Sequence, residues 1–115
     1  MTNPDINHMS MHVFAEVPSQ ELALSVGASI ARKLADYGEV TVCDPKQYWK
    51  IAEYFEFFVE VRNNKLVDKD KTKLANSVGE GWTDAGSNLI WNFSVDTHFV
   101  DDKVRWANLE FFEVA

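Results

Sequence analysis

The sequence predicts an α+β fold, with a mainly antiparallel sheet of about five strands and two helices packed on one face. Two observations lead to this prediction. Several stretches alternate apolar and polar residues, as strands do, and two segments repeat apolar residues at helical spacing. The elements follow one another as strand, helix, strand, strand, helix, strand, strand. One arrangement that fits this order is a ferredoxin-like sheet with an added strand.

The first strand and the first helix are expected early in the chain. Residues 1–10 are polar and lack a sustained period, so they are expected to form a flexible lead before a single domain over residues 11–115. Residues 11–17 suit a strand that is apolar on both faces. Ser19 is the expected N-cap of a helix that ends near Gly38. The apolar stripe of this helix recurs every four residues, at Leu22, Val26, Ile30 and Leu34.

The later elements follow from the same two patterns. A short strand is expected over residues 39–43 and a long one over residues 53–62, with a loop or a single turn between them. The second helix ends at Gly79 and Gly81, and two final strands are expected over residues 89–96 and 104–114. Trp91 and Phe93 are expected to lie buried beneath the first helix. The other residues expected on the core side of these elements are Phe55, Phe57, Val59, Val61, Leu74, Ala75, Val78, Leu89, Val95, Ala107, Leu109 and Phe111.

Composition limits the classes of protein that this chain can belong to. It has 115 residues, of which 18 are acidic and 11 basic, so the formal net charge is −7; its 46% hydrophobic fraction supports a folded core. An acidic chain is not expected to bind nucleic acid, because such binding needs cations. The single cysteine, Cys43, excludes an internal disulfide and a multi-cysteine zinc site. The sequence shows neither a secretory signal nor a membrane-spanning apolar run, so a cytoplasmic location is expected.

Catalytic and metal-binding patterns are sparse. The sequence carries neither a phosphate-loop or dinucleotide fingerprint nor a nucleophile elbow, and Cys43 is expected to be a small apolar strand residue. Residues that could supply oxygen and nitrogen ligands to a metal ion occur together on one short segment. The same residue types suit a solvated hairpin loop, which is the favoured interpretation. No cofactor, no metal ion and no enzymatic activity are therefore expected. The residues in question are Asp96, His98, Asp101 and Asp102.

One face of the predicted sheet is expected to remain uncovered and to carry aromatic and acidic side chains. Such a face is either an ordinary solvated sheet surface or a docking surface, on which aromatic side chains anchor a basic partner and carboxylates orient it. Trp82 is either a second anchor in an acidic loop or a cap on the core, since it follows Val78 by four residues. The candidate partner-binding residues are Glu56, Phe58, Glu60, Trp82, Asp84, Asp96, Asp101, Asp102, Trp106 and Glu110.

The two late strand segments, residues 89–95 (LIWNFSV) and 104–112 (VRWANLEFF), carry a resemblance. With the small size, acidity and aromatic content, they make the chain resemble the immunity proteins of bacterial polymorphic toxin systems, of which contact-dependent growth inhibition systems are the nearest group. The resemblance implies a non-enzymatic inhibitor that binds one cognate toxin domain, often a nuclease, and blocks its active site or substrate surface. An acidic surface suits that role, because it competes for the cationic groove in which a nuclease holds phosphates.

The sequence leaves two other functions open. One is a small enzyme, a hydrolase or isomerase, with a pocket between sheet and helix and with Asp96 and His98 as acid–base groups. The other is a homo-oligomeric ligand-binding module that hides its aromatic face in a homodimer. The enzyme requires titratable groups that converge in a concave pocket. The homodimer requires a symmetric apolar patch.

Overall fold

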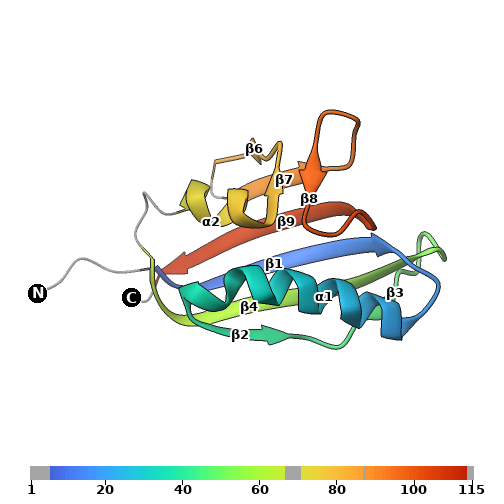
Figure 1. The fold of residues 1–115 in the computed structure, drawn as a ribbon, viewed down its shortest axis with the longest axis horizontal. Coiled ribbons are helices and arrows are strands. Elements are labelled where there is room, and N and C mark those ends of the chain that lie inside the picture. The colour runs from blue at the N-terminus through green and yellow to red at the C-terminus, as the bar shows by residue number, and fades with distance from the viewer. Residues whose placement is uncertain (1–5, 67–70, 87, 114–115) are drawn as a thin grey trace, which may run out of the picture.

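The structure, a computed structural model, describes residues 6–66, 71–86 and 88–113. They form two layers, a sheet and two α-helices that lie on one of its faces (Figure 1). Neither of these helices is long and apolar enough to cross a membrane. In chain order the elements are β1 (Ile6–Glu16), α1 (Gln20–Leu34), the 3-10 helix η1 (Ala35–Tyr37), β2 (Glu39–Val42), β3 (Lys46–Gln47), β4 (Tyr54–Leu66), α2 (Lys71–Val78), β5 (Gly79–Glu80), β6 (Thr83–Asp84), β7 (Asn88–Asn92), β8 (His98–Phe99) and β9 (Val104–Glu113).

The α+β class is confirmed, and the sheet is larger than expected. Its strands follow the order β2-β4-β1-β9-β7-β6, and β3 also pairs with β4, which makes seven strands in place of about five. All the pairings are antiparallel. The added strands β3 and β6 have only two residues each, too few to show a period in the sequence. Two connections cross over other strands: α1 connects β1 to β2 across β4, and the segment that includes α2 and β5 connects β4 to β6 at the far edge of the sheet, across β1, β9 and β7.

The helix-covered face of the sheet holds the core. In β1, Met9, Met11, Val13 and Ala15 alternate with polar and aromatic residues, and all four are completely buried. The inward residues of β4 and β9 continue this layer, as their alternation predicts. The core residues from those strands are Phe57, Val59, Val61, Val104, Ala107 and Leu109, with Phe55 and Phe111 packed against them.

Helix α1 begins as predicted, and its expected apolar stripe is buried except at the first position. The Ser19 hydroxyl accepts a hydrogen bond from the Leu22 backbone N–H at 3.3 Å, which is the expected N-cap. Leu22 is 41% exposed, whereas Val26, Ile30 and Leu34 are buried. The small residues Ala23 and Gly27 are buried beside them. Small residues let the helix approach β4 and β2 closely.

Residues 6–10, expected in a flexible lead, form the first half of β1. Met9 is completely buried there, and His8 and Met9 pair with β4 on one side and β9 on the other. His8 and Ser10 misled the prediction, because they occupy outward positions of a central strand. Residues 1–5 lie outside the described residues.

The strand expected over residues 89–96 ends at Asn92, and this corrects the placement of the residues that follow. Phe93 is 56% exposed and Val95 is 99% exposed, although both were expected in the core. The chain turns here because the Thr97 hydroxyl donates to the carbonyl of Asn92 at 3.0 Å and accepts from the N–H of Ser94 at 2.8 Å. A side chain that closes a turn in this way competes with strand pairing.

Trp91 is buried, as predicted, but the β5–β8 pair provides its partners instead of α1. Its indole N–H donates to the carbonyl of Glu80 at 2.8 Å. Its ring meets Phe99 with a centroid distance of 4.8 Å. The two-stranded sheet therefore forms a lid over this end of the core, beside α2 (Figure 1).

Candidate functional site

The sheet face opposite the helices is formed by the alternate residues of β1, β4 and β9, and we call it the open face. It points away from the core because every second residue of these strands points toward the helices. In Figure 1 it lies behind the sheet, on the side without helices. The residues that define the open face are His8, His12, Phe14, Glu56, Phe58, Glu60, Trp106, Asn108, Glu110 and Phe112.

A cluster of rings occupies the middle of the open face. The His12 imidazole stacks on Phe58 with a centroid distance of 4.2 Å and an interplanar angle of 14°. On its other sides lie Phe14 at 4.6 Å and the edge of Trp106 at 6.1 Å. Since these residues come from β1, β4 and β9, the cluster ties the three central strands together on the side that has no helix.

Each histidine of the open face is hydrogen bonded to a carboxylate of β4. His12 Nε2 lies 3.1 Å from Glu56 Oε1, and His8 Nε2 lies 2.8 Å from Glu60 Oε1. The four side chains are between 21% and 30% exposed, so the pairs are partly shielded from water. These contacts hold the two carboxylates in defined positions on the face.

Glu60 has further partners, and they decide its charge. Burial by itself would raise the pKa of Glu60, but hydrogen bonds from His8 and Cys43 and the charges of His8 and Arg62 outweigh it, so the pKa is lowered. The Cys43 thiol donates to Glu60 Oε2 at 3.5 Å, and Arg62 lies 3.5 Å from Oε1. Glu60 is therefore a carboxylate at neutral pH.

Cys43 is held as a thiol. Burial, the hydrogen bond to Glu60 and the negative charge of that carboxylate all raise its pKa. A protonated thiol is a poor nucleophile and a poor metal ligand. Cys43 thus serves as a small, half-buried neighbour of Glu60 at the end of β2.

At the end of the open face where β1 ends and β4 begins, four aromatic residues line a cleft of about 310 Å³. We call it the aromatic cleft; its lining residues are Phe14, Tyr48, Tyr54 and Trp106. The Phe14 ring meets Tyr48 at 4.7 Å and Trp106 at 5.2 Å, with interplanar angles of 81° and 76°. Because these rings meet edge to face and do not stack in parallel, they leave a cleft between them.

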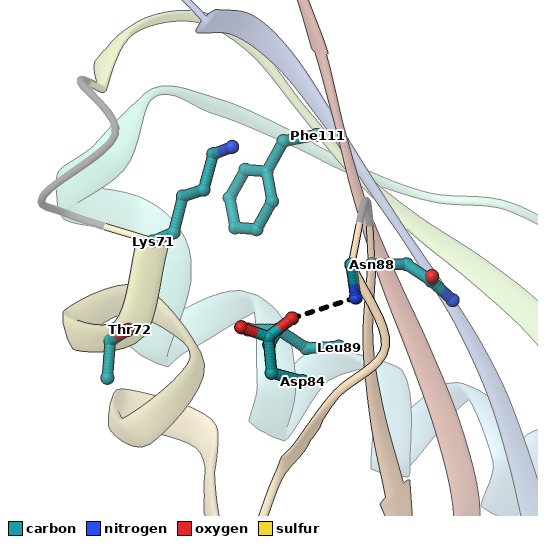
Figure 2. A pocket seen from close by; sticks show the side chains of 7 residues that line it. Lys71, Thr72, Asp84, Asn88, Leu89 and Phe111 are labelled. Carbon is teal, nitrogen blue, oxygen red and sulfur yellow. Dashed lines mark hydrogen bonds between the residues drawn. The ribbon is translucent and has the colours of Figure 1, made fainter.

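A second pocket, of about 250 Å³, lies on the helix side between α2 and the β6–β7 hairpin. Figure 2 shows Lys71 extending alongside the ring of Phe111, and its Nζ lies 5.4 Å from the ring centroid. Asp84 Oδ1 accepts from the backbone N–H of Gly86 at 2.9 Å, so its carboxylate closes the turn. Both charged groups therefore already serve the local structure.

The ten residues predicted to bind a partner divide into two groups. Five of them lie together on the open face: Glu56, Phe58, Glu60, Trp106 and Glu110. The other five lie outside it: Trp82, Asp84, Asp96, Asp101 and Asp102.

Trp82 is a cap on the core, which decides between its two interpretations. Its indole N–H donates to the carbonyls of Ala75 at 2.9 Å and Gly79 at 3.0 Å. Its ring lies 6.0 Å from that of Phe99, and the side chain is half-buried against the core. The tryptophan thereby satisfies carbonyl groups at the end of α2.

The three late aspartates occupy turns. Asp96 was expected on the open face but lies exposed in the turn after β7. Asp101 Oδ1 accepts from the backbone N–H of Lys103 at 2.9 Å, and the Asp102 side chain is 93% exposed. Among the described residues no group of three or more His, Cys, Asp or Glu side chains is placed to hold a metal ion.

Sequence reasoning missed several members of the site. His8 was assigned to the lead, although its spacing of four from His12 places both on one face of a strand. His12 and Phe14 were recognised as outward residues without a role. Tyr48 lies in an irregular segment between β3 and β4, where no period marks it.

No protein-family model, curated protein or solved structure matches this chain. What it does is therefore inferred from the chemistry of the open face and from the resemblance of the late strand segments. The face offers rings for contact area, carboxylates held by histidines, and one cleft lined by aromatic residues.

Proposed function

We propose that this chain is a protein-binding domain that docks a basic partner on its open face. Following the resemblance, the partner is a bacterial toxin domain, and the chain is a cytoplasmic immunity protein that neutralises it without catalysing a reaction. The observation that carries the proposal is the open face itself, on which aromatic side chains and fixed carboxylates alternate across three strands. Aromatic residues are among those that dominate binding energy at protein interfaces, and carboxylates steer and orient a basic partner.

Exposed apolar area supports the proposal. Phe58 and Phe112 on the open face are each 43% exposed, and Trp49, next to Tyr48, is 81% exposed. Covering an exposed aromatic ring removes apolar area from water, so a partner that covers these rings gains binding free energy. A docked protein would cover them together.

Charge supports a basic partner in particular. The chain has a net charge of −7, and Glu56, Glu60 and Glu110 lie on the open face. A field of this sign speeds encounter with a positive surface and disfavours contact with a second copy of the chain. The phosphate-binding groove of a nuclease is a surface of the complementary sign.

The direct test is protection of cells. Candidate basic toxin domains are sought in the reading frames next to the gene of this chain; the chain is co-expressed with each, and survival is measured. Full protection, together with a stable purified complex, is expected. Death of the cells despite folded, abundant chain would overturn the proposal.

A charge reversal locates the docking face. Glu110 is exposed, and among the described residues it accepts one exposed side-chain hydrogen bond, from Asn108 at 3.0 Å, so Glu110→Lys should leave the fold intact. Asp36→Lys on η1, on the helix side, is the matched control because it changes net charge equally. We expect Glu110→Lys to slow association by roughly tenfold at low salt and the control to slow it far less. Equal effects of the two variants would move the docking site elsewhere.

Salt provides a further test of steering. Added salt screens charges separated by more than about 8–10 Å, so the association rate with the toxin domain should fall steeply as salt rises. Stopped-flow mixing at low and high salt measures this dependence. A flat rate would contradict electrostatic steering.

Glu56 and Glu60 are less suitable for charge reversal than Glu110. Both were expected to act only as surface contacts, but their hydrogen bonds to His12 and His8 make them part of the folded structure. A lysine at either position would leave the histidine facing an ammonium group instead of a carboxylate. Neutral glutamine variants are therefore the appropriate substitutions.

A further inference from the structure

The aromatic cleft is assembled from four separate segments and is held in shape. Phe14 comes from β1, Trp106 from β9, Tyr54 from the first position of β4, and Tyr48 from the preceding loop. The Tyr48 backbone N–H donates to the Tyr54 carbonyl at 2.8 Å, and Gln47 Nε2 donates to the Ala52 carbonyl at 2.9 Å. These bonds fix the loop, so the cleft exists before any ligand binds.

Its lining selects a narrow class of ligand. The face of an aromatic ring carries partial negative charge and attracts an organic cation, most strongly when several rings surround it. With about 310 Å³, the cleft is large enough for a guanidinium group and small compared with most ligand pockets. A neutral apolar group would gain burial there but not the electrostatic attraction.

Carboxylates flank the cleft. In the sheet register Glu56 lies opposite Phe14, and Glu16 lies opposite Tyr54. Basic groups are also close: Arg105 Nε lies 3.1 Å from Glu16 Oε1, and Lys46 is the β3 partner of Glu56. These partners moderate the local charge, but the net charge of −7 still favours a cation over an anion.

The chain already uses the same chemistry within itself. The Arg105 guanidinium lies over the Phe93 ring at 4.4 Å from its centroid, and Lys50 Nζ lies 5.0 Å from the Trp49 centroid. Of the two cations, the guanidinium is planar and more weakly hydrated, so it enters an aromatic site at the lower cost.

We infer that the aromatic cleft receives an arginine side chain of the basic partner, stacked among Phe14, Tyr48 and Trp106. This inference rests on the proposed function, because it names the group with which the partner is anchored. Buried arginine and tryptophan are the residues that most often dominate binding energy at interfaces. The cleft would thus anchor the partner at one end of the open face, with Glu56 beside it.

A small probe tests the cleft without any partner. Ethylguanidinium is titrated into the ¹⁵N-labelled chain and compared with ethylurea, which has nearly the same shape and no charge. The indole N–H signal of Trp106 and the backbone N–H signal of residue 48 report occupancy. We expect ethylguanidinium to bind roughly 5- to 30-fold more tightly than ethylurea, the range that a partly desolvated cation–π contact gives. Equal binding of the two probes would overturn the inference.

Variants localise the probe. Trp106→Leu and Tyr48→Leu each remove one wall and should abolish the preference for the cation; the loop position of Tyr48 makes its variant the safer one for folding. Phe112→Leu is the matched control, since it removes a ring from the same strand and face outside the cleft. Circular dichroism verifies that each variant is folded. A control that loses the preference as fully as the Tyr48 variant would overturn the inference.

The outcomes separate this inference from the proposed function. Probe binding that depends on Tyr48, without protection against a toxin, would support the cleft and reject the immunity role. Protection that is unchanged by Tyr48→Leu, in a chain with no cation preference, would reject the cleft alone. Sedimentation of the isolated chain covers the remaining case: a dimer disrupted by Trp106→Leu would show that a second copy occupies the cleft, which also overturns the inference.

Discussion

The same three strands present two faces that differ in chemistry and in what shields them. On the covered face, β1 places Met9, Met11 and Val13 completely out of contact with water. On the open face, the same strand places His8 and His12, with 30% and 25% of their side chains exposed. A period of two thus separates core residues from the residues of the open face along one segment of chain.

The comparison shows two ways of stabilising a sheet face. Helices and the β5–β8 pair bury aliphatic residues on one side, where stability comes from removing apolar area from water. On the other side, ring contacts and His–Glu hydrogen bonds connect neighbouring strands while leaving part of each group accessible. Substitutions on the two faces should therefore differ in magnitude and in kind.

The largest effect is expected at Trp91 on the covered face. Trp91→Ala should destabilise the fold by about 3–5 kcal/mol, because it leaves a large cavity and removes the partner of the Glu80 carbonyl. Chemical denaturation measures the loss. Trp106→Ala on the open face should cost clearly less, since that ring is only half-buried. Equal losses at the two positions would break the distinction between the faces.

A smaller effect is expected where α1 contacts the sheet. A Cβ at Gly27 would lie 2.7 Å from Val42 Cγ1, so Gly27→Ala must push α1 or β2 aside. We expect a net loss of roughly 1–2 kcal/mol, because overpacking outweighs a gain in helix propensity of about 1 kcal/mol. Ser25→Ala, exposed on the same helix, controls for propensity and should be neutral or slightly stabilising. A stabilised Gly27→Ala variant would show that α1 does not pack tightly against β2 at this position.

The open face should contribute stability that depends on pH. Because folding lowers the pKa of Glu60, its carboxylate stabilises the fold above the ordinary value of 4.5, and this contribution is lost as pH falls through the lower, folded-state pKa. Glu60→Gln should therefore be less stable than wild type at neutral pH, by up to about 1 kcal/mol. The deficit should shrink in acid. Urea denaturation across a pH series measures it, and a deficit that stays constant would contradict this assignment.

The smallest effect on stability is expected at Trp49. Since its side chain is 81% exposed, Trp49→Ala should change the free energy of unfolding by no more than about 0.5 kcal/mol. If the open face docks a protein, the same variant should weaken partner binding measurably, which calorimetry would detect. A large loss of stability would mean that Trp49 packs on the fold.

Segments with a strong hydrophobic period were predicted well. Burial of one face requires an apolar residue at every second position of a strand and at every third or fourth position of a helix. The inward residues of β4, the Ser19 cap and the buried residues of α2 all follow from such local rules. The open face was also predicted, since the residues of β4 and β9 opposite the core must point away from it. Alternation in sequence was sufficient for these assignments.

Where strands begin and end was decided by partners that are distant in sequence. Residues 6–10 have no apolar period, yet pairing with β4 and β9 on both sides makes them the centre of the sheet. Residues 93–96 continue an alternating pattern, yet a turn closed by the Thr97 hydroxyl takes them out of the sheet. A local pattern does not reveal whether a neighbouring strand is present to pair with it.

The sequence by itself determined the α+β class, the phase of the long strands and the acidic, aromatic character of the open face, because each depends on neighbours a few positions apart. Only the tertiary structure decided that His8 and His12 hold Glu60 and Glu56, and that Trp82 caps the core. It also brought Phe14, Tyr48, Tyr54 and Trp106 around one cleft. Strand order and register determine these contacts, and they arise from long-range pairing that no short segment encodes.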